Sequence, residues 1–357
     1  MGKNKHRIVI VGFGGMGNWH RELIESGIDG LELAGMYDIK EERQQAARDL
    51  GYRAYNSFED VLADETVDLI LTSTPNDCHK PLAIAALHAG KNVVSEKPVT
   101  LSSKDLQEMI DAANRSGKLF TVHQNRRWDE DFLTMKKIYD EGLLGEVFNI
   151  ESRVHGSRGI PGDWRGKKEH GGGMMLDWGV HILDQMLLLV PEKIKNVYCK
   201  VNHVTNYEVD DGFTMIITFE SGKTALLEVG TSNFIELPRW YMLGENGSAQ
   251  IDDFSCKGRM VRVKSWDKND AVPVKTAAGL TKTMAPRTDE TIETEEIVPV
   301  KSDIKDFYRN VMAAIDGEEG QLIRHDQMMR VMRLMETGLR AAEEGKILPF
   351  ENDSVCV

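Results

Sequence analysis

The segment Arg7-Ile-Val-Ile-Val-Gly12-Phe-Gly14-Gly-Met-Gly17 decides the expected fold of the chain. A short apolar run followed by Gly-x-Gly-x-x-Gly predicts a buried strand, a tight turn and a helix. In this pattern Gly12 permits the turn, Gly14 lets the backbone approach a pyrophosphate, and Gly17 allows close packing of the helix. The free N–H groups at the helix N-terminus suit phosphates. The segment therefore predicts a dinucleotide site formed by Gly12, Phe13, Gly14, Met16 and Gly17.

A carboxylate follows the next expected strand, residues 31–37, and indicates which dinucleotide binds. Asp38 in this place would accept hydrogen bonds from the adenosine ribose and would repel a 2′-phosphate, so NAD is favoured over NADP. The next residue, Ile39, adds no compensating charge, although Lys40 could offset the repulsion. The alternative for Asp38 is an ordinary turn residue.

Strand and helix patterns alternate up to about residue 125. We expect strands at 7–11, 31–37, 67–73, 92–95 and 119–123, and helices ending near 26 and spanning 41–50, 81–89 and 102–116. Ser57-Phe-Glu-Asp60 is typical of a capping box that opens another short helix. This alternation predicts an α/β fold with a doubly wound parallel sheet.

Strand patterns dominate the remainder of the chain. After a helix at 129–141, they fall at 147–155, 196–205, 212–220, 223–232 and 239–243, interrupted by one helix at 174–189. Strands that follow one another directly predict a large, mostly antiparallel sheet. We expect helices to cover one face of this sheet and a second subunit to cover the other face.

The end of the chain combines a polar segment with two helices. Residues 267–296 are expected to form a long loop or an extended excursion, and a solvated loop is favoured over a substrate lid. Helices are expected at 303–314 and 325–344, and the methionines of the second are interpreted as core packing. We divide the chain into a dinucleotide-binding domain, 1–125, and a substrate-binding domain, 126–357, whose last helices can pack back on the first domain.

Composition excludes several classes of protein. The formal net charge of −13 argues against a nucleic-acid or anionic-membrane surface. The cysteines, Cys78, Cys199, Cys256 and Cys356, have neither metal-ligand nor disulfide spacing, so we expect no metal and a reducing compartment. The sequence shows no membrane-length apolar run and no signal-peptide core, which favours the cytoplasm.

Short polar side chains follow the expected strand at 67–73. Ser73, Thr74 and Asn76 suit hydrogen bonds to a ribose, and His79 lies three residues further on. They leave the carboxyl edge of the sheet, where ligands of such folds bind. An ordinary turn with a helix cap is the alternative.

Glu96-Lys97-Pro98 leaves the next strand at the same edge and supplies the first candidate for chemistry. The charge of an oxidised nicotinamide and partial burial would both favour the neutral amine of Lys97, which suits proton transfer. A surface lysine is the alternative.

A second chemical cluster lies within Gly171-Gly-Gly173-Met-Met-Leu-Asp177-Trp-Gly-Val-His181. Asp177 and His181 stand at i and i+4, which places them on one helix face. Such a pair can orient an imidazole to take a proton from an alcohol. A polar helix face or a buried, satisfied histidine is the alternative, and zinc lacks a further ligand set.

Together these segments resemble the Gfo/Idh/MocA family of NAD(P)-dependent oxidoreductases along nearly the whole chain. The resemblance lies in the glycine turn, Thr74-Pro75-Asn76 with His79, Glu96-Lys97-Pro98, Gly142-Leu-Leu-Gly145-Glu-Val and 171–184. It implies an N-terminal Rossmann domain and a C-terminal α/β domain, whose open sheet often forms an oligomer interface.

The resemblance also implies residue roles and a reaction. Lys97, Asp177 and His181 would surround the reacting hydroxyl, and Trp164 and Arg165 would lie near the nicotinamide with Glu96. Contacts from His155 and Asp163 to the substrate are implied more weakly. The expected reaction is hydride transfer between NAD and a secondary alcohol of a sugar, cyclitol or glycoside. The alternatives are a redox-neutral reaction with retained NAD and a non-catalytic sugar- or nucleotide-sensing regulator.

Overall fold

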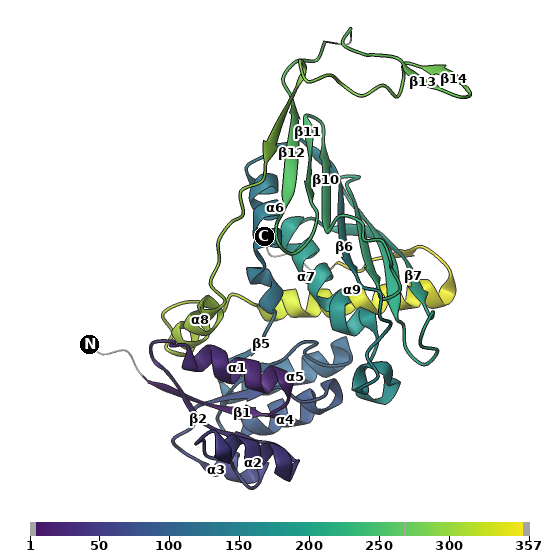
Figure 1. The fold of residues 1–357 in the computed structure, drawn as a ribbon. Helices are drawn as coiled ribbons and strands as arrows, with labels where there is room; N and C mark the ends of the chain where they lie inside the picture. The colour runs from purple at the N-terminus through teal and green to yellow at the C-terminus, as the bar shows by residue number, and fades with distance from the viewer. Residues whose placement is uncertain (1–4, 268, 353–357) are drawn as a thin grey trace.

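The computed structural model describes residues 5–267 and 269–352, so Cys356 lies outside the described residues. Two sheets dominate the fold, a smaller one near the N-terminus and a larger one from the second half of the chain (Figure 1). The expected α/β class is therefore confirmed.

The smaller sheet contains five parallel strands in the order β2-β1-β3-β4-β5. Ile8, Ile10 and Leu71 are fully buried within it, as expected for strands covered on both faces. Its strands are β1 (His6–Val11), β2 (Leu31–Tyr37), β3 (Leu69–Thr72), β4 (Asn92–Ser95) and β5 (Phe120–Val122). The accompanying helices are α1 (Gly15–Glu25), α2 (Glu41–Asp49), α3 (Phe58–Ala63), α4 (Asn76–His88) and α5 (Ser103–Ser116).

Two helices begin at the capping residues expected from the sequence, and one expected start is an exception. Ser57 accepts a hydrogen bond from the N–H of Asp60 at the start of α3, and Ser102 does the same for α5. The exception is α4, which begins at Asn76 rather than at Pro81. The expectation of a start at Pro81 was wrong because this proline lies inside the helix instead of at its first position.

The larger sheet has nine strands in the order β15-β12-β11-β10-β6-β9-β8-β7-β16. It is mostly antiparallel, but β6 and β9 run parallel. The strands are β6 (Val147–His155), β7 (Ile194–Asn202), β8 (Gly212–Phe219), β9 (Thr224–Gly230), β10 (Trp240–Gly244), β11 (Gly247–Ile251), β12 (Gly258–Val263), β15 (Ile292–Glu296) and β16 (Leu348–Pro349).

Four strands of this sheet were missed in the sequence, namely β11, β12, β15 and β16. The most instructive is β15, because Ile-Glu-Thr-Glu-Glu carries the charge typical of a protected sheet edge. The segment 267–296 is therefore not a loop throughout, because it includes this strand, and the alternative of an extended excursion fits it better. This segment also holds a hairpin, β13 (Val274–Thr276) and β14 (Gly279–Thr281), which extends away from the body of the molecule (Figure 1).

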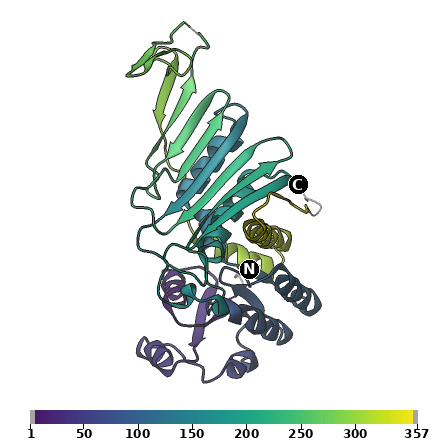
Figure 2. The same cartoon turned by 90° about the vertical axis from the view of Figure 1, so that its right-hand side faces the viewer.

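Helices cover one face of the larger sheet, and the strands are seen in front of them in Figure 2. They are α6 (Glu130–Asp140), α7 (Val180–Leu189) and α9 (His325–Glu344), whereas α8 (Lys305–Ile315) lies beside α1 (Figure 1). The methionines of α9 are at most 7% exposed, which confirms their role in the core: Met328, Met329, Met332 and Met335. None of the helices within the described ranges is long and apolar enough to cross a membrane.

The last helices contact the smaller sheet and its helices. The hydroxyl of Tyr308 in α8 lies 2.7 Å from Nδ1 of His20 in α1. The carboxylate of Glu336 in α9 accepts a hydrogen bond from the N–H of Ser103 at the start of α5. These contacts hold α8 and α9 against the first half of the chain, while a boundary at residue 125 stays a prediction.

Candidate active site

Two glycines of the glycine turn are closely packed against backbone atoms, and the third is open. A Cβ atom at Gly12 would lie 2.6 Å from the backbone oxygen of Ser73, and one at Gly17 would lie 2.2 Å from that of Gly12. Gly14, in contrast, has no such neighbour within 4 Å. Ser73 strengthens the turn, since its hydroxyl donates to the Gly12 oxygen across 2.6 Å. The turn thus leaves open backbone at the N-terminus of α1.

Asp38 fastens the end of β2 to this turn. Its carboxylate accepts hydrogen bonds from the N–H groups of Phe13, at 2.7 Å, and Lys40, at 2.9 Å. Ile39 beside it is 84% exposed. The carboxylate therefore lies at the mouth of the glycine turn, next to an uncovered apolar side chain.

The surrounding polar atoms fit a dinucleotide. Within the described part of the chain, the Thr74 hydroxyl is buried without a hydrogen-bond partner, and its methyl carbon lies 3.0 Å from where a Gly12 Cβ would be. The Asn76 amide donates to the backbone oxygen of Gly171 across 2.8 Å, which ties the second half of the chain to this edge. An unpaired hydroxyl beside open helix N–H groups is what a bound phosphate or ribose would satisfy.

His79 connects two backbone segments of the site. The ring is fully buried, and its nitrogens lie 2.9 Å from the backbone oxygen of Pro98 and 3.0 Å from that of Thr74. Both nitrogens are engaged with the backbone, so this side chain holds two of the edge segments together. The Lys97–Pro98 peptide bond between these segments is cis.

Lys97 and Asp177 meet between the two halves of the chain. The Lys97 amine donates to Oδ1 of Asp177 at 2.8 Å and to its backbone oxygen at 3.0 Å. The guanidinium of Arg165 lies 3.5 Å from the other carboxylate oxygen. Burial raises the pKa of Asp177, but the charge and hydrogen bond of Lys97, with Arg165, outweigh it and bring the pKa below its usual value. Asp177 is therefore a carboxylate that holds the lysine.

The glycine run before Asp177 is needed for close packing. A Cβ at Gly172 would lie 2.2 Å from the Arg165 backbone oxygen, and one at Gly173 would lie 2.3 Å from the carboxylate of Asp210. Asp210 in turn accepts a hydrogen bond from the N–H of Met175. Burial raises the pKa of Asp210 to about 6. The run therefore brings Arg165 and the start of the Asp177 helix together.

His181 follows Asp177 but does not pair with it. Its ring is buried, and Nδ1 has no hydrogen-bond partner among the residues that the structure describes. Met175–Gly179 is a π-helical turn, so the α-helical i, i+4 alignment with Asp177 does not apply. The expectation that Asp177 orients the imidazole was therefore wrong. Burial, together with the Lys97 and Arg126 cations, holds the pKa of His181 well below its usual range.

Four other expected residues have different partners. Asp163 caps the 3-10 turn Trp164–Gly166 and pairs with Arg165 across 2.7 Å. The Arg165 guanidinium also lies over the Trp164 ring and beside Asp177, so Asp163, Trp164 and Arg165 are connected to the Lys97–Asp177 contact through this one group. His155 instead bonds Glu228, at 3.2 Å, and receives the N–H of Leu237. These hydrogen bonds lie along the larger sheet rather than with Lys97.

Two neighbours were missed in the sequence. The Arg126 guanidinium stacks 4.0 Å over the ring of Trp178, whose centroid lies 5.8 Å from that of His181. Arg126 also contributes to the pKa shifts of Asp177 and His181. The signal was Asn125-Arg-Arg-Trp128 directly after the last strand of the parallel sheet, but a basic pair there is also typical of a solvated turn.

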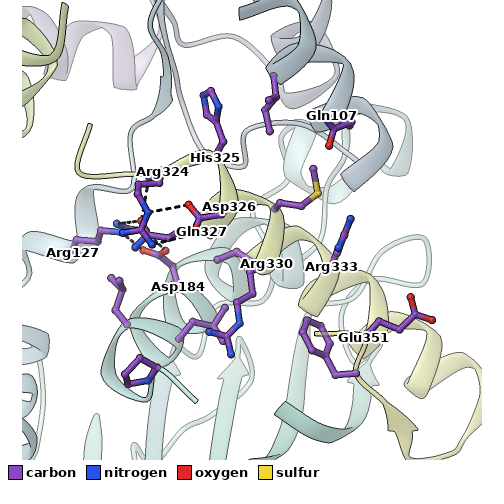
Figure 3. A pocket seen from close by; sticks show the side chains of 17 residues that line it. Gln107, Arg127, Asp184, Arg324, His325, Asp326, Gln327, Arg330, Arg333 and Glu351 are labelled. Carbon is purple, nitrogen blue, oxygen red and sulfur yellow. Dashed lines mark hydrogen bonds and ion pairs between the residues drawn. The ribbon is translucent and has the colours of Figure 1, made fainter. Parts of the chain in front are cut away.

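A separate cavity of about 620 Å³ lies between α5, α7 and α9 (Figure 3). Arg127 and Asp184 form an ion pair of 2.6 Å at its wall, and Arg324 pairs with Asp326 nearby. Its lining, as the structure describes it, includes none of the candidate site residues. We interpret Asp184, the last acidic residue of the Asp177 helix, as part of the packing between helices.

The families that match this chain agree with its fold and with the arrangement of its candidate site. The parallel sheet with its glycine turn defines an NAD-binding oxidoreductase fold: residues 6–124 match the oxidoreductase family with an NAD-binding Rossmann fold. Residues 132–250 match the GFO/IDH/MocA C-terminal domain. The chain therefore belongs to the Gfo/Idh/MocA oxidoreductase family, and its cofactor is NAD.

Relatives and solved structures cover nearly the full chain. An NAD-binding protein from Listeria innocua is 47% identical, with a TM-score of 0.94, over 97% of this chain and 99% of that one. The uncharacterized oxidoreductase YdgJ of Escherichia coli is 29% identical over 94% of this chain and 96% of its own length. The scyllo-inositol 2-dehydrogenase (NADP(+)) IolW of Bacillus subtilis is 27% identical over 97% and 96%.

Proposed function

We propose that the protein transfers a hydride between NAD and a secondary hydroxyl or ketone of a sugar, cyclitol or glycoside. The observation that carries this proposal is the Lys97–Asp177 contact near His181, whose Nδ1 has no hydrogen-bond partner in the described part of the chain. Bound NAD would supply the hydride acceptor. An inositol dehydrogenase among the full-length relatives favours a polyol substrate.

Three side chains would divide the proton chemistry. Lys97, which Asp177 holds by a hydrogen bond of 2.8 Å, donates a hydrogen bond to the reacting oxygen and stabilises its developing negative charge. His181 accepts the hydroxyl proton, because its depressed pKa keeps the imidazole neutral. Asp177 orients the lysine amine, which leaves His181 free to act on the substrate.

The nearby surface suits a polyhydroxy compound. A hollow of about 450 Å³ is lined by Arg126, Asp129, Glu130, Asp131, Trp178 and Phe254. Two aromatic rings and four charged side chains form its lining, and this combination offers both an apolar surface and hydrogen-bonding groups to a polyhydroxy compound. Because Trp178 also contacts His181, a substrate in this hollow would reach the candidate base.

We further propose that the protein is a cytoplasmic homo-oligomer that associates through the uncovered face of the larger sheet. Phe148, Tyr198 and Ile216 are between 36% and 51% exposed, and they lie on β6, β7 and β8 of that sheet. The free thiols of Cys78, Cys199 and Cys256 suit a reducing compartment. Replacing Phe148 with glutamate should lower the molecular mass measured in solution, and an unchanged mass would contradict this interface.

The reaction is tested by a panel of sugars, inositols and glycosides followed by NADH fluorescence. The panel is repeated with a keto-sugar acceptor, because retained NAD would give substrate conversion without NADH release. We expect at least one carbinol to be oxidised by the wild type and not by Lys97→Met. Binding of a sugar without turnover in either format would instead favour a sensing regulator.

A further inference from the structure

A buried carboxylate lies directly behind the lysine. Oε1 of Glu96 is 2.8 Å from Nε2 of His20 and 2.8 Å from Nδ1 of His123. Oε2 accepts the backbone N–H of Lys97 at 3.0 Å. Glu96 is 4% exposed and both histidines are fully buried. The carboxylate predicted to bind the cofactor is thus occupied by three protein donors.

The donor directions in this cluster are set by chemistry. Burial and the charge of Glu96 raise the pKa of Tyr308 well above its usual value, so the phenol keeps its proton and donates to Nδ1 of His20. Burial and the charge of His123 lower the pKa of His20 to about 4, so that ring is neutral. Its single N–H therefore points to Glu96, whose pKa the two histidines bring well below its usual value against the effect of burial.

We propose that Glu96, His20, His123 and Tyr308 form a positioning network that fixes the backbone of Lys97. The network runs from Tyr308 in α8 through His20 in α1 to Glu96, and His123 joins it from the end of β5. It connects a C-terminal helix to the lysine without touching the substrate. The inference rests on the proposed function, because it assigns the network to the catalytic position of that lysine.

A metal ion is the competing explanation for the cluster. One nitrogen of each histidine and one Glu96 oxygen lie within 4.8 Å of one another, a spacing that a metal could use. Both Glu96 oxygens already accept hydrogen bonds, however, and the second nitrogen of His20 is taken by Tyr308. Both Glu96 oxygens and both His20 nitrogens therefore have hydrogen-bond partners, whereas Nε2 of His123 has none among the residues that the structure describes, and metal content becomes one arm of the test.

Two conservative variants separate positioning from general stability. Glu96→Gln retains the shape, but an amide has one acceptor oxygen and one donor group where the site needs two acceptors. Either the histidines or the Lys97 N–H then lose their partner. Tyr308→Phe removes only the hydroxyl. Tyr55→Phe is the matched control, because Tyr55 is a buried tyrosine that donates to Asp64 at 2.9 Å in another part of the chain.

In the wild-type holoenzyme and these variants, kcat, KM, NAD affinity and melting temperature are measured. Because displacement of a catalytic group by about 1 Å can cost about 100-fold, we expect Glu96→Gln to lower kcat by about that factor. The loss of one buried hydrogen bond in Tyr308→Phe should lower kcat about tenfold. KM, NAD affinity and the Tyr55→Phe control should change little.

The pH profile supplies a readout that a structural role would not move. His181 is faced by Lys97, Arg126 and His123, which lower its pKa, and by Glu96, which raises it. Because Glu96→Gln removes the charge that raises the pKa of His181, the acidic limb of the pH profile of kcat should move to lower pH. A lower melting temperature with an unchanged limb and unchanged kcat in the folded fraction would overturn the proposal.

Chemical labelling keeps the test independent of the substrate. Acetylation of Lys97 by acetic anhydride, followed by mass spectrometry and normalised to the exposed Lys104, should be faster in Glu96→Gln and Tyr308→Phe than in wild type. Equal labelling would overturn the network, as would a stoichiometric metal ion in the purified wild type. Failure of the proposed reaction would appear separately, as a wild type that oxidises no carbinol but shows this labelling difference.

Discussion

The amine of Lys97 lies 2.8 Å from Oδ1 of Asp177, and the two residues are 80 positions apart in the chain. One comes from the loop after β4 of the parallel sheet, and the other from the π-helical turn before α7. This contact joins the edge of the parallel sheet where the dinucleotide is expected to the turn before α7, a helix that packs on the larger sheet.

Lys97→Met should remove the donor while keeping a side chain of similar length. Because general acid–base and oxyanion-stabilising groups contribute about 100-fold or more, kcat should fall by about that factor or more. NAD affinity should remain near wild type, since the glycine turn and Asp38 are intact. Steady-state kinetics and NAD titration check this, with Lys104→Met on the exposed face of α5 as the matched control.

His181→Ala should also lower kcat by about 100-fold, because the candidate proton acceptor is lost. The depressed pKa of His181 means that the imidazole stays neutral below the ordinary histidine range of about 6.5. In the wild type, the acidic limb of kcat should therefore lie below that pH. A limb above pH 6.5 that is retained in His181→Ala would show that another group accepts the proton.

Asp38→Ser combined with Ile39→Arg should shift the cofactor preference. The variant removes a carboxylate that would repel a 2′-phosphate and adds a cation beside it. Since like-charge contacts cost several kcal/mol, the ratio of kcat/KM for NADP to that for NAD should rise by about 100-fold. Initial rates with both cofactors measure this ratio. An unchanged ratio would mean that Asp38, which also holds the N–H of Phe13, acts only on the turn.

Asp210 should make the folded protein less stable as the pH rises. Its pKa is about 6 when folded, against 3.8 as the ordinary value, so the folded state binds the proton more tightly. The contribution is fully present below about pH 4 and is lost as pH rises through 6, by about 3 kcal/mol. Asp210→Asn should lack this loss. Denaturant unfolding of both proteins at pH 4.5 and pH 7 would refute the expectation if their stability difference stayed constant.

The sequence identified the parallel sheet and its edge because local patterns define them. Strands β1 and β3 contain continuous buried apolar runs, and close backbone contacts require glycine at positions 12 and 17. The edge strand β15 was missed because its glutamates match an exposed loop equally well. Such a strand is specified by its neighbour β12 rather than by its own residues.

The candidate site was only partly predictable for a similar reason. Lys97, Asp177 and His181 could each be selected from motifs, but their pairing depends on a π-helical turn that sequence spacing does not reveal. Glu96 was expected at the cofactor, yet its partners His20 and His123 come from distant segments. Contacts of this kind are determined by the tertiary packing of α1 and β5 against the Lys97 loop.

The most direct test of the central claim uses a substrate deuterated at the carbinol carbon that is oxidised in the panel. If the Lys97 site promotes direct hydride transfer, deuterium will appear at C4 of the nicotinamide, or in the reduced acceptor when NAD is retained. The Lys97→Met variant should transfer little in the same time. Oxidation of the substrate with its deuterium released to water, and none in either product, would contradict the account.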